Sequence, residues 1–161
     1  MIVIIMGAAG AGKTTVGRAL AEALGWRFID ADDLHPPSNI DKIRSGIALT
    51  DEDRAPWLAR THDAILRASG EQADLVLACS ALRQDYRVTL ADRIADVRWV
   101  FLDADAELLA ARLRNRPGHF AGPAIVGSQL ETLERPRDAL TLDAGLPVDA
   151  LVEAIRTHVG R

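Results

Sequence analysis

The chain has 161 residues, close to the usual size of one domain, and offers little room for a second independent core. Hydrophobic residues make up 48% of it and charged residues 26%, so neither a disordered nor a fibrous protein fits this composition. The net charge of -4 provides no general attraction to nucleic acid or to an anionic membrane. A single cysteine, Cys79, excludes an intrachain disulfide and a multi-cysteine zinc site.

The chain carries no segment typical of export or of a membrane span. Residues 1–6 are apolar, but they are too few for a signal peptide and run into a glycine-rich turn. No later stretch reaches the about 18 apolar residues that a membrane helix requires. We therefore expect a cytoplasmic protein.

Apolar, β-branched runs alternate with amphipathic helical patterns along the chain. In chain order, strands are expected at residues 2–5, 27–29, 75–79 and 98–102, and more weakly at 139–142. The first helical pattern is a stripe from Val16 to Leu24, closed by Gly25, and the second opens with a capping box of Thr50 and Asp53 and closes at Gly70. Three more patterns follow: a stripe of Leu82, Tyr86, Leu90 and Ile94, a helix over 105–116, and a terminal helix from Val148 to Val159.

This alternation predicts a three-layer α/β domain over residues 1–161, with right-handed crossovers and a mostly parallel sheet of about five strands. Two stretches that contain glycine and proline interrupt the pattern, residues 34–50 and residues 116–127. The second stretch is expected to be a mobile excursion from the domain.

Residues 7–14 read Gly-Ala-Ala-Gly-Ala-Gly-Lys-Thr, the pattern of a phosphate-binding loop (P-loop), directly after a strand and before a helix. In such a loop the glycines allow backbone N–H groups to converge on phosphate oxygens, and the helix N-terminus adds a partial positive charge. Lys13 is expected to reach the β- and γ-phosphates, and the Thr14 hydroxyl to ligate magnesium. The motif therefore predicts binding of a nucleoside triphosphate.

Other features narrow the class of P-loop protein. A guanine-specific switch needs an Asn-Lys-x-Asp motif, but Lys42, the only other lysine, lies in Ile-Asp-Lys-Ile. A motor ATPase usually has a longer chain and a strand that ends in a magnesium-linked aspartate. Residues 99–103 have the pattern of such a strand. Asp103, however, is followed by Asp105 and a helix, so capping of that helix explains Asp103 at least as well as a link to magnesium.

The size favours a small-molecule kinase, in which mobile segments close over the acceptor. Residues 28–35 place Asp30, Asp32, Asp33 and His35 just past the second strand, where open α/β sheets bind ligands. A carboxylate there is a candidate base for an attacking hydroxyl, and a solvated acidic turn is the alternative.

Two arginine pairs have helical spacing, Arg112 with Arg116 and Arg83 with Arg87. Beside a phosphate loop, such pairs are candidates to stabilise the migrating phosphoryl group, and a solvated helix face is the alternative.

Taken together, the motifs resemble those of the small P-loop gluconokinases of bacteria, which are related to shikimate and adenylate kinases. The resemblance runs over nearly the whole chain through ordered segments: 6–15, 30–32, 34–37, 39–40, 49–54, 56–58, 79–82, 86–87, 118–120 and 128–129. It implies a shikimate-kinase-like P-loop fold, an acceptor-binding segment at about 34–60 and a mobile lid at about 116–127. It also implies transfer of the γ-phosphate of ATP to the 6-hydroxyl of D-gluconate, with Mg2+, and suggests a homodimer.

The resemblance also implies roles for individual residues. Lys13, Asp32 and Arg116 would be catalytic, with Asp32 as the base, while Thr14 and Asp30 would serve the metal, Asp30 through water. The residues expected at ATP are Gly7, Ala8, Ala9, Gly10, Ala11, Gly12, Lys13, Thr14, Thr15, Arg112, Arg116 and Pro147. The residues expected at gluconate are Asp32, His35, Lys42, Arg54, Arg83, Arg87, His119 and Gln129.

Some alternatives stay open. Asp33 is an extra acid, so the base is not assigned uniquely among the three aspartates of residues 30–33. Residues 80–82, Ser-Ala-Leu, replace the glycine triplet of shikimate kinases, which disfavours shikimate as the acceptor. A kinase for a related polyol or sugar acid, and a regulatory module that binds ATP without transferring phosphate, are the competing functions.

Overall fold

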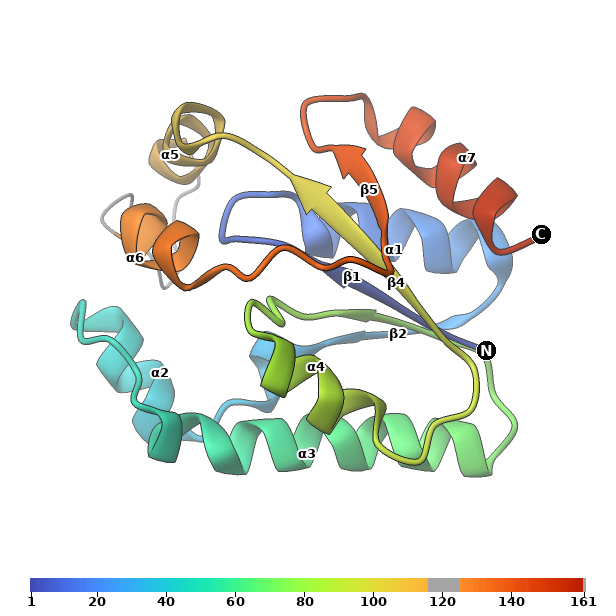
Figure 1. The fold of residues 1–161 in the computed structure, drawn as a ribbon, viewed down its shortest axis with the longest axis horizontal. Helices are drawn as coiled ribbons and strands as arrows, with labels where there is room; N and C mark the ends of the chain where they lie inside the picture. Colours follow the sequence, from blue (N-terminus) through green and yellow to red (C-terminus); the bar gives the residue numbers. More distant parts are fainter. Residues whose placement is uncertain (116–124, 161) are drawn as a thin grey trace.

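The computed structural model describes residues 1–115 and 125–160. Within them, a five-stranded sheet has the strand order β2-β3-β1-β4-β5, and every neighbouring pair is parallel (Figure 1). The strands are β1 (Ile2–Met6), β2 (Arg27–Asp30), β3 (Leu75–Ala78), β4 (Val97–Asp103) and β5 (Leu140–Asp143). The predicted parallel α/β class and all five predicted strands are confirmed.

Helices follow each strand, as expected for parallel crossovers. They are α1 (Lys13–Leu24), the 3-10 helix η1 (Ala31–Leu34), α2 (Pro37–Arg44), α3 (Asp51–Gly70), α4 (Gln84–Ala91), α5 (Ala106–Arg114), α6 (Ile125–Thr132) and α7 (Val148–His158). The predicted capping box is confirmed: the Thr50 hydroxyl accepts from the Asp53 N–H, and the Asp53 carboxylate accepts from the Thr50 N–H. None of the described helices is long and apolar enough to cross a membrane.

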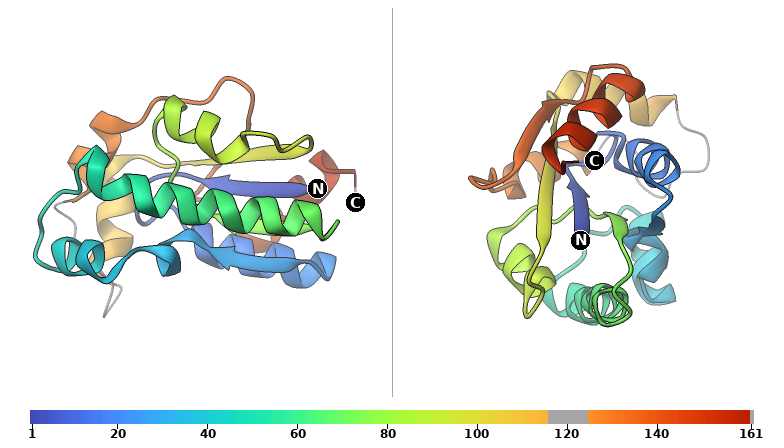
Figure 2. Two further views of the ribbon diagram at one scale, coloured as in Figure 1. Left: turned by 90° about the horizontal axis from the view of Figure 1, so that it is seen from below. Right: turned by 90° about the vertical axis from the view of Figure 1, so that its right-hand side faces the viewer.

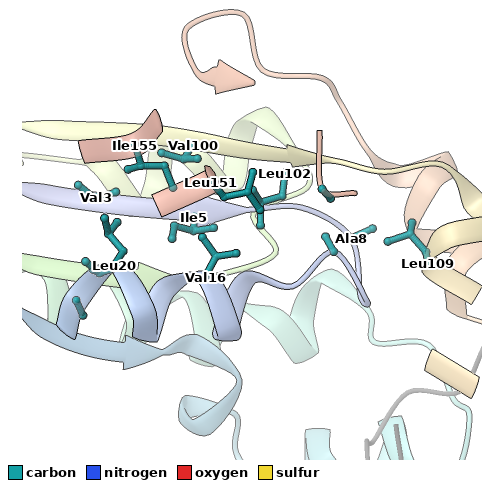
Figure 3. Close-up of a cluster of buried hydrophobic side chains, with 14 of the residues drawn as sticks. Val3, Ile5, Ala8, Val16, Leu20, Val100, Leu102, Leu109, Leu151 and Ile155 are labelled. Carbon is teal, nitrogen blue, oxygen red and sulfur yellow. The ribbon is translucent and has the colours of Figure 1, made fainter. Parts of the chain in front are cut away.

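The two faces of the sheet are covered by different helices. Successive side chains of β1 point to opposite faces, so they pack in two separate clusters. Val3 and Ile5 pack in one cluster with side chains of α1 and α7, including Leu20 and Ile155 (Figure 3). The alternate residues of β1 pack in a second cluster on the side of α3 and α4. The views of Figure 2 show the sheet between these helices, which confirms three layers.

The predicted boundaries of two helices were wrong. The stripe after Ser80 forms a shorter helix, α4, which leaves Leu82 and Ile94 outside it. Helix α2 forms within the stretch 34–50, and α6 begins at Ile125, inside the stretch 116–127. Helix α5 ends at Arg114, short of the predicted end at 116, and Arg116 itself lies outside the described residues.

The carboxyl ends of the strands gather the polar segments at one end of the sheet. The P-loop follows β1, η1 follows β2, and Cys79 and Ser80 follow β3. Helices α2 and α6 lie at this same end of the molecule in both Figure 1 and Figure 2. This is where open parallel sheets bind their ligands.

The packing of α1 against β2 leads to a prediction about Gly17. A Cβ at this buried helical position would lie 2.7 Å from Cε2 of Phe28. Although alanine is the better helix former, Gly17→Ala should therefore lower the free energy of unfolding by about 1–3 kcal/mol in urea denaturation.

The matched control is Gly70→Ala, also helical, where an added Cβ meets nothing within 4 Å. It should leave the free energy of unfolding unchanged or raise it by up to about 1 kcal/mol. Equal behaviour of the two variants would show that Phe28 does not constrain α1.

Candidate active site

The P-loop connects β1 to α1 in the conformation that the motif predicts. Gly7 has φ +149° and lies so close to β4 that a Cβ would approach the Leu102 carbonyl oxygen to 2.8 Å. Gly12, with φ +95°, is the N-cap of α1 and has no side chain to cap the helix. The loop therefore curls tightly, and the N-terminal end of α1, with its positive partial charge, lies next to the loop.

Thr14 and Asp30 join the P-loop helix to the end of β2. The Thr14 hydroxyl donates to Oδ2 of Asp30 at 2.6 Å. The other carboxylate oxygen, Oδ1, accepts from the backbone N–H of Asp32 at 3.0 Å and thereby caps η1. The structure thus brings together the Thr14 hydroxyl and the Asp30 carboxylate, the two groups expected to serve a metal, and places Asp32, the candidate base, next to them.

A cavity of about 520 Å³ opens between the P-loop and the acceptor segment. Its lining includes Lys13 and Thr14 on one side and Asp32, His35 and Arg54 on the other. Lys13 Nζ donates to the Ala8 carbonyl at 3.0 Å, which places the ammonium beside the loop. Asp33 is exposed and is not among the lining residues, so the geometry distinguishes it from Asp32.

His35 is held against the side chain of Trp57. The two rings stack with centroids 4.6 Å apart and an interplanar angle of 10°. Burial lowers the pKa of His35 below its ordinary value, Asp32 partly opposes this shift, and Arg54 adds to it. The imidazole is therefore kept in the neutral form near pH 7.

Arg54 reaches the cavity from the first turns of α3 and is oriented by a polar network. Its guanidinium donates to the Tyr86 hydroxyl at 3.3 Å, and that hydroxyl donates to Asp51 at 2.8 Å. Arg83 pairs with Asp85 at 2.8 Å and lies 3.5 Å from Asp51. The guanidinium groups of Arg54 and Arg83 both lie over the Tyr86 ring. The network places two arginines at the junction of α3 and α4.

Lys42, on α2, contacts the capping residue of α3. Its ammonium lies 2.7 and 2.8 Å from the two carboxylate oxygens of Asp53. The hydrogen bond from Lys42, with those from the Thr50 backbone and hydroxyl, lowers the pKa of Asp53 to about 2. Lys42 itself does not appear among the residues that line the 520 Å³ cavity.

Arg87, which the resemblance implies at gluconate, is buried in the structure. It is 5% exposed, and its guanidinium donates to the carbonyl oxygens of Ala81, Leu82 and Glu134. Its remaining donors bond the Gln84 side chain. Arg87 is thus a buried structural residue that ties the end of β3 to the segment after α6, and its donors are taken by protein groups.

A second cavity, of about 270 Å³, lies on the other side of the P-loop. Arg112 lines it and donates to the carbonyl oxygens of Gly10, Ala11 and Ala144. Leu146 and Val148, the neighbours of Pro147, also line it, whereas Pro147 is the N-cap of α7. The structure therefore brings Arg112 and the loop before α7 together beside the P-loop.

Gln129, on α6, contacts the P-loop directly. Its side-chain oxygen accepts from the Ala9 N–H at 2.6 Å across 120 residues of sequence, and Gln129 lines the larger cavity. Arg116 and His119, the two residues expected in the lid, lie outside the described residues.

Asp103, at the end of β4, forms an ion pair with Arg135 at 2.8 Å. The helix cap is instead Asp105, which accepts from the Leu108 N–H. Cys79 is fully buried at the end of β3, and burial raises the pKa of its thiol to about 12. The thiol therefore stays protonated and supplies no anion to the site.

Several residues near the site have no sequence signal for their role. Asn39 contacts His35, and Tyr86 links Asp51 to Arg54, but these contacts join separate helices. The Trp57 indole N–H donates to the buried Ala31 carbonyl, and only the resemblance singles out Trp57. For Asn39, the available signal is that a polar residue without an assigned role lies within a segment of the resemblance, residues 39–40.

Comparison with known proteins gives a consistent result. The shikimate kinase family model matches residues 9–144. Thermosensitive gluconokinase of Escherichia coli (strain K12) is 41% identical over 160 residues, which cover 97% of this chain and 86% of the relative.

Two solved structures also superpose on the chain. A gluconokinase from Sinorhizobium meliloti 1021 has a TM-score of 0.85 at 40% identity, with 99% of this chain and 91% of that chain covered. An unliganded sugar kinase from Janibacter sp. HTCC2649 has a TM-score of 0.91 at 36% identity, with 99% and 94% covered.

The Lys42–Asp53 contact predicts a pH dependence of stability. Because the pKa of Asp53 is lower in the folded state than in the unfolded state, its stabilising effect is complete above about pH 5 and is lost as the pH falls toward 2. In urea denaturation, the difference between wild type and Asp53→Asn should therefore shrink from about pH 5 to about pH 3.

Lys42→Met keeps the Asp53 carboxylate but removes its main partner. The free energy of unfolding of this variant should therefore change less between about pH 5 and about pH 3 than that of the wild type. A wild-type advantage over Asp53→Asn that is the same at both pH values would contradict this account of the capping box.

Proposed function

The chain belongs to the gluconokinases, within the shikimate-kinase-like P-loop kinases, and from this we propose that it transfers the γ-phosphate of ATP to the 6-hydroxyl of D-gluconate. The products are 6-phosphogluconate and ADP. The observation that carries the proposal is that one cavity is lined both by the P-loop and by Asp32, His35 and Arg54. Phosphate donor and hydroxyl acceptor would therefore meet in one space.

The residues at the P-loop fit Mg2+ and ATP. Mg2+ prefers oxygen ligands and keeps several waters, and the Thr14 hydroxyl and Asp30 carboxylate lie 2.6 Å apart at the start of α1. Thr14 would hold the metal directly and Asp30 through water, while the loop N–H groups and Lys13 hold the phosphates. When bound, the metal neutralises charge on the phosphate oxygens.

Asp32 is the residue that we assign as the base. Its backbone N–H is anchored on Asp30, and its side chain lines the cavity on the acceptor side. From there its carboxylate would orient the 6-hydroxyl and accept its proton as the phosphorus–oxygen bond forms. Lys13 would stabilise the charge that develops on the migrating phosphoryl group.

The acceptor side carries groups suited to a polyhydroxy acid. Arg54 offers a charged, bidentate donor for a carboxylate, and His35 offers a neutral ring. Lys42 is paired with Asp53 and Arg83 with Asp51, both on α3, so we assign them to the positioning of α2 and α4 against that helix. Gln129, which lines the same cavity from α6, would also contact the substrate.

The smaller cavity is our candidate for the nucleotide base. Arg112 stands on one side of it and the loop that contains Pro147 on the other. Because Arg112 is fixed by three carbonyl oxygens, its planar guanidinium is held in place to stack on a purine ring.

A panel of acceptors tests the proposed reaction. With ATP and Mg2+, gluconate should give the highest kcat/KM in an assay of ADP release, and 31P NMR should show a phosphate ester at carbon 6. Turnover of shikimate, a nucleoside monophosphate or another sugar acid without gluconate would reject the substrate assignment. ATP binding with no acceptor turned over would favour the regulatory module.

The adjacent acids allow a matched test of the base. Asp32→Asn should lower kcat by about 100-fold or more, because the amide cannot accept the proton, and should leave ATP binding unchanged. Asp33→Asn, which changes an exposed acid outside the cavity lining, should stay within a few-fold of wild type. The reverse ranking of the two variants would move the base to Asp33.

A further inference from the structure

Asn39 is a buried polar residue of α2 to which the proposed reaction gives no role. It is 2% exposed, and its amide nitrogen Nδ2 lies 2.8 Å from the Asp53 carbonyl oxygen and 3.2 Å from Nδ1 of His35. A carbonyl oxygen can only accept a hydrogen bond, so this contact establishes which end of the amide faces His35. The second N–H of Nδ2 is then the donor available to the imidazole.

This arrangement determines the tautomer of His35. Nδ1 accepts the hydrogen bond from Asn39, so it carries no proton. In a neutral imidazole the proton must then be on Nε2, which becomes a donor. Among the described residues, no hydrogen bond to Nε2 of His35 is found, so this donor is available to a ligand in the cavity that His35 lines.

The plane of the ring is fixed as well as its proton. His35 stacks on Trp57, and the Trp57 indole N–H donates to the Ala31 carbonyl at 2.6 Å. Because Trp57 is 3% exposed and Ala31 is fully buried, this support is rigid. The imidazole therefore has a fixed plane and a fixed edge toward the cavity.

The surroundings favour the neutral ring. Two charged groups face it from the elements packed around it, Asp32 from η1 and Arg54 from α3, and they act in opposite directions. Burial is the largest effect and disfavours the imidazolium. With Nδ1 bonded to Asn39 and the proton on Nε2, the neutral ring presents no lone pair to the cavity that could take the proton of the substrate hydroxyl.

We propose that Asn39 is a positioning residue that sets the tautomer of His35, so that the ring donates its Nε2–H to a hydroxyl or carboxylate oxygen of the sugar acid. The recipient rests on the proposed function, whereas the tautomer does not. On this account His35 discriminates among acceptors by requiring an oxygen acceptor at one fixed point, and it takes no part in proton abstraction.

The first test reads the tautomer directly. Long-range 1H–15N NMR of the 15N-labelled wild-type protein near neutral pH, with His35→Gln to assign the signals, should show a protonated Nε2 and a bare Nδ1 for His35. His62 is an internal reference, because its Nε2 lies 2.9 Å from the Asp92 carbonyl and must carry the proton. A protonated Nδ1 in His35, or an imidazolium, overturns the proposal without any variant.

The second test uses substitutions of Asn39. Asn39→Ala should raise KM for gluconate by about tenfold or more, with little change in kcat or in KM for ATP. Asn39→Asp offers only acceptors, so His35 should become protonated on Nδ1 in the NMR spectrum. Ser38→Ala, at an exposed neighbour on the same helix, is the control and should match wild type.

A double-mutant cycle separates positioning from general stabilisation. If Asn39 acts through His35, Asn39→Ala should add almost nothing to the KM effect of His35→Gln. Additive effects, or an equal loss of affinity for ATP, would overturn the proposal. Wild-type protein that fails to phosphorylate gluconate but shows the Nε2–H tautomer would instead reject the proposed function and leave the role of Asn39 standing.

Discussion

The Asp30 carboxylate is the group on which the arrangement of the site depends. One of its oxygens accepts from the Thr14 hydroxyl at the start of α1, and the other accepts from the backbone N–H of Asp32. A single side chain thereby relates the P-loop to the acceptor segment, which belong to consecutive strands that are not neighbours in the sheet. This link acts directly between the phosphate-binding loop and the candidate base, in addition to the sheet that carries both.

The N-terminus of α3 organises the opposite wall of the cavity. Asp53, the capping-box partner of Thr50, holds Lys42 through its side chain and Asn39 through its carbonyl, so α2 is attached to the first turn of α3. Asp51, two residues earlier, reaches Tyr86 on α4. The acidic first turn thus has two functions: it favours the helix through the macrodipole, and it holds side chains of α2 and α4 in place.

The parts of the structure that could be predicted from sequence are those whose physics is local. The strands, the P-loop and the capping box each depend on a few consecutive residues, and the structure confirms them. Arg87 could not be placed, because its partners include the Glu134 carbonyl, 47 residues away. The contact of Gln129 with Ala9 spans 120 residues, and no spacing rule predicts it. The resemblance named Asp32, His35 and Arg54, but only the fold shows that they share a cavity with the P-loop.

On the proposed function, the cavity presents the acceptor hydroxyl to Asp32 and to the terminal phosphate at the same time. A crystal structure with gluconate, Mg2+ and a non-hydrolysable ATP analogue measures this directly. The account predicts the 6-hydroxyl in hydrogen-bond contact with the Asp32 carboxylate and in line with the γ-phosphorus, with an acceptor oxygen on Nε2 of His35. Gluconate bound with its 6-hydroxyl against Asp33, or outside the space between Lys13 and Asp32, would contradict it.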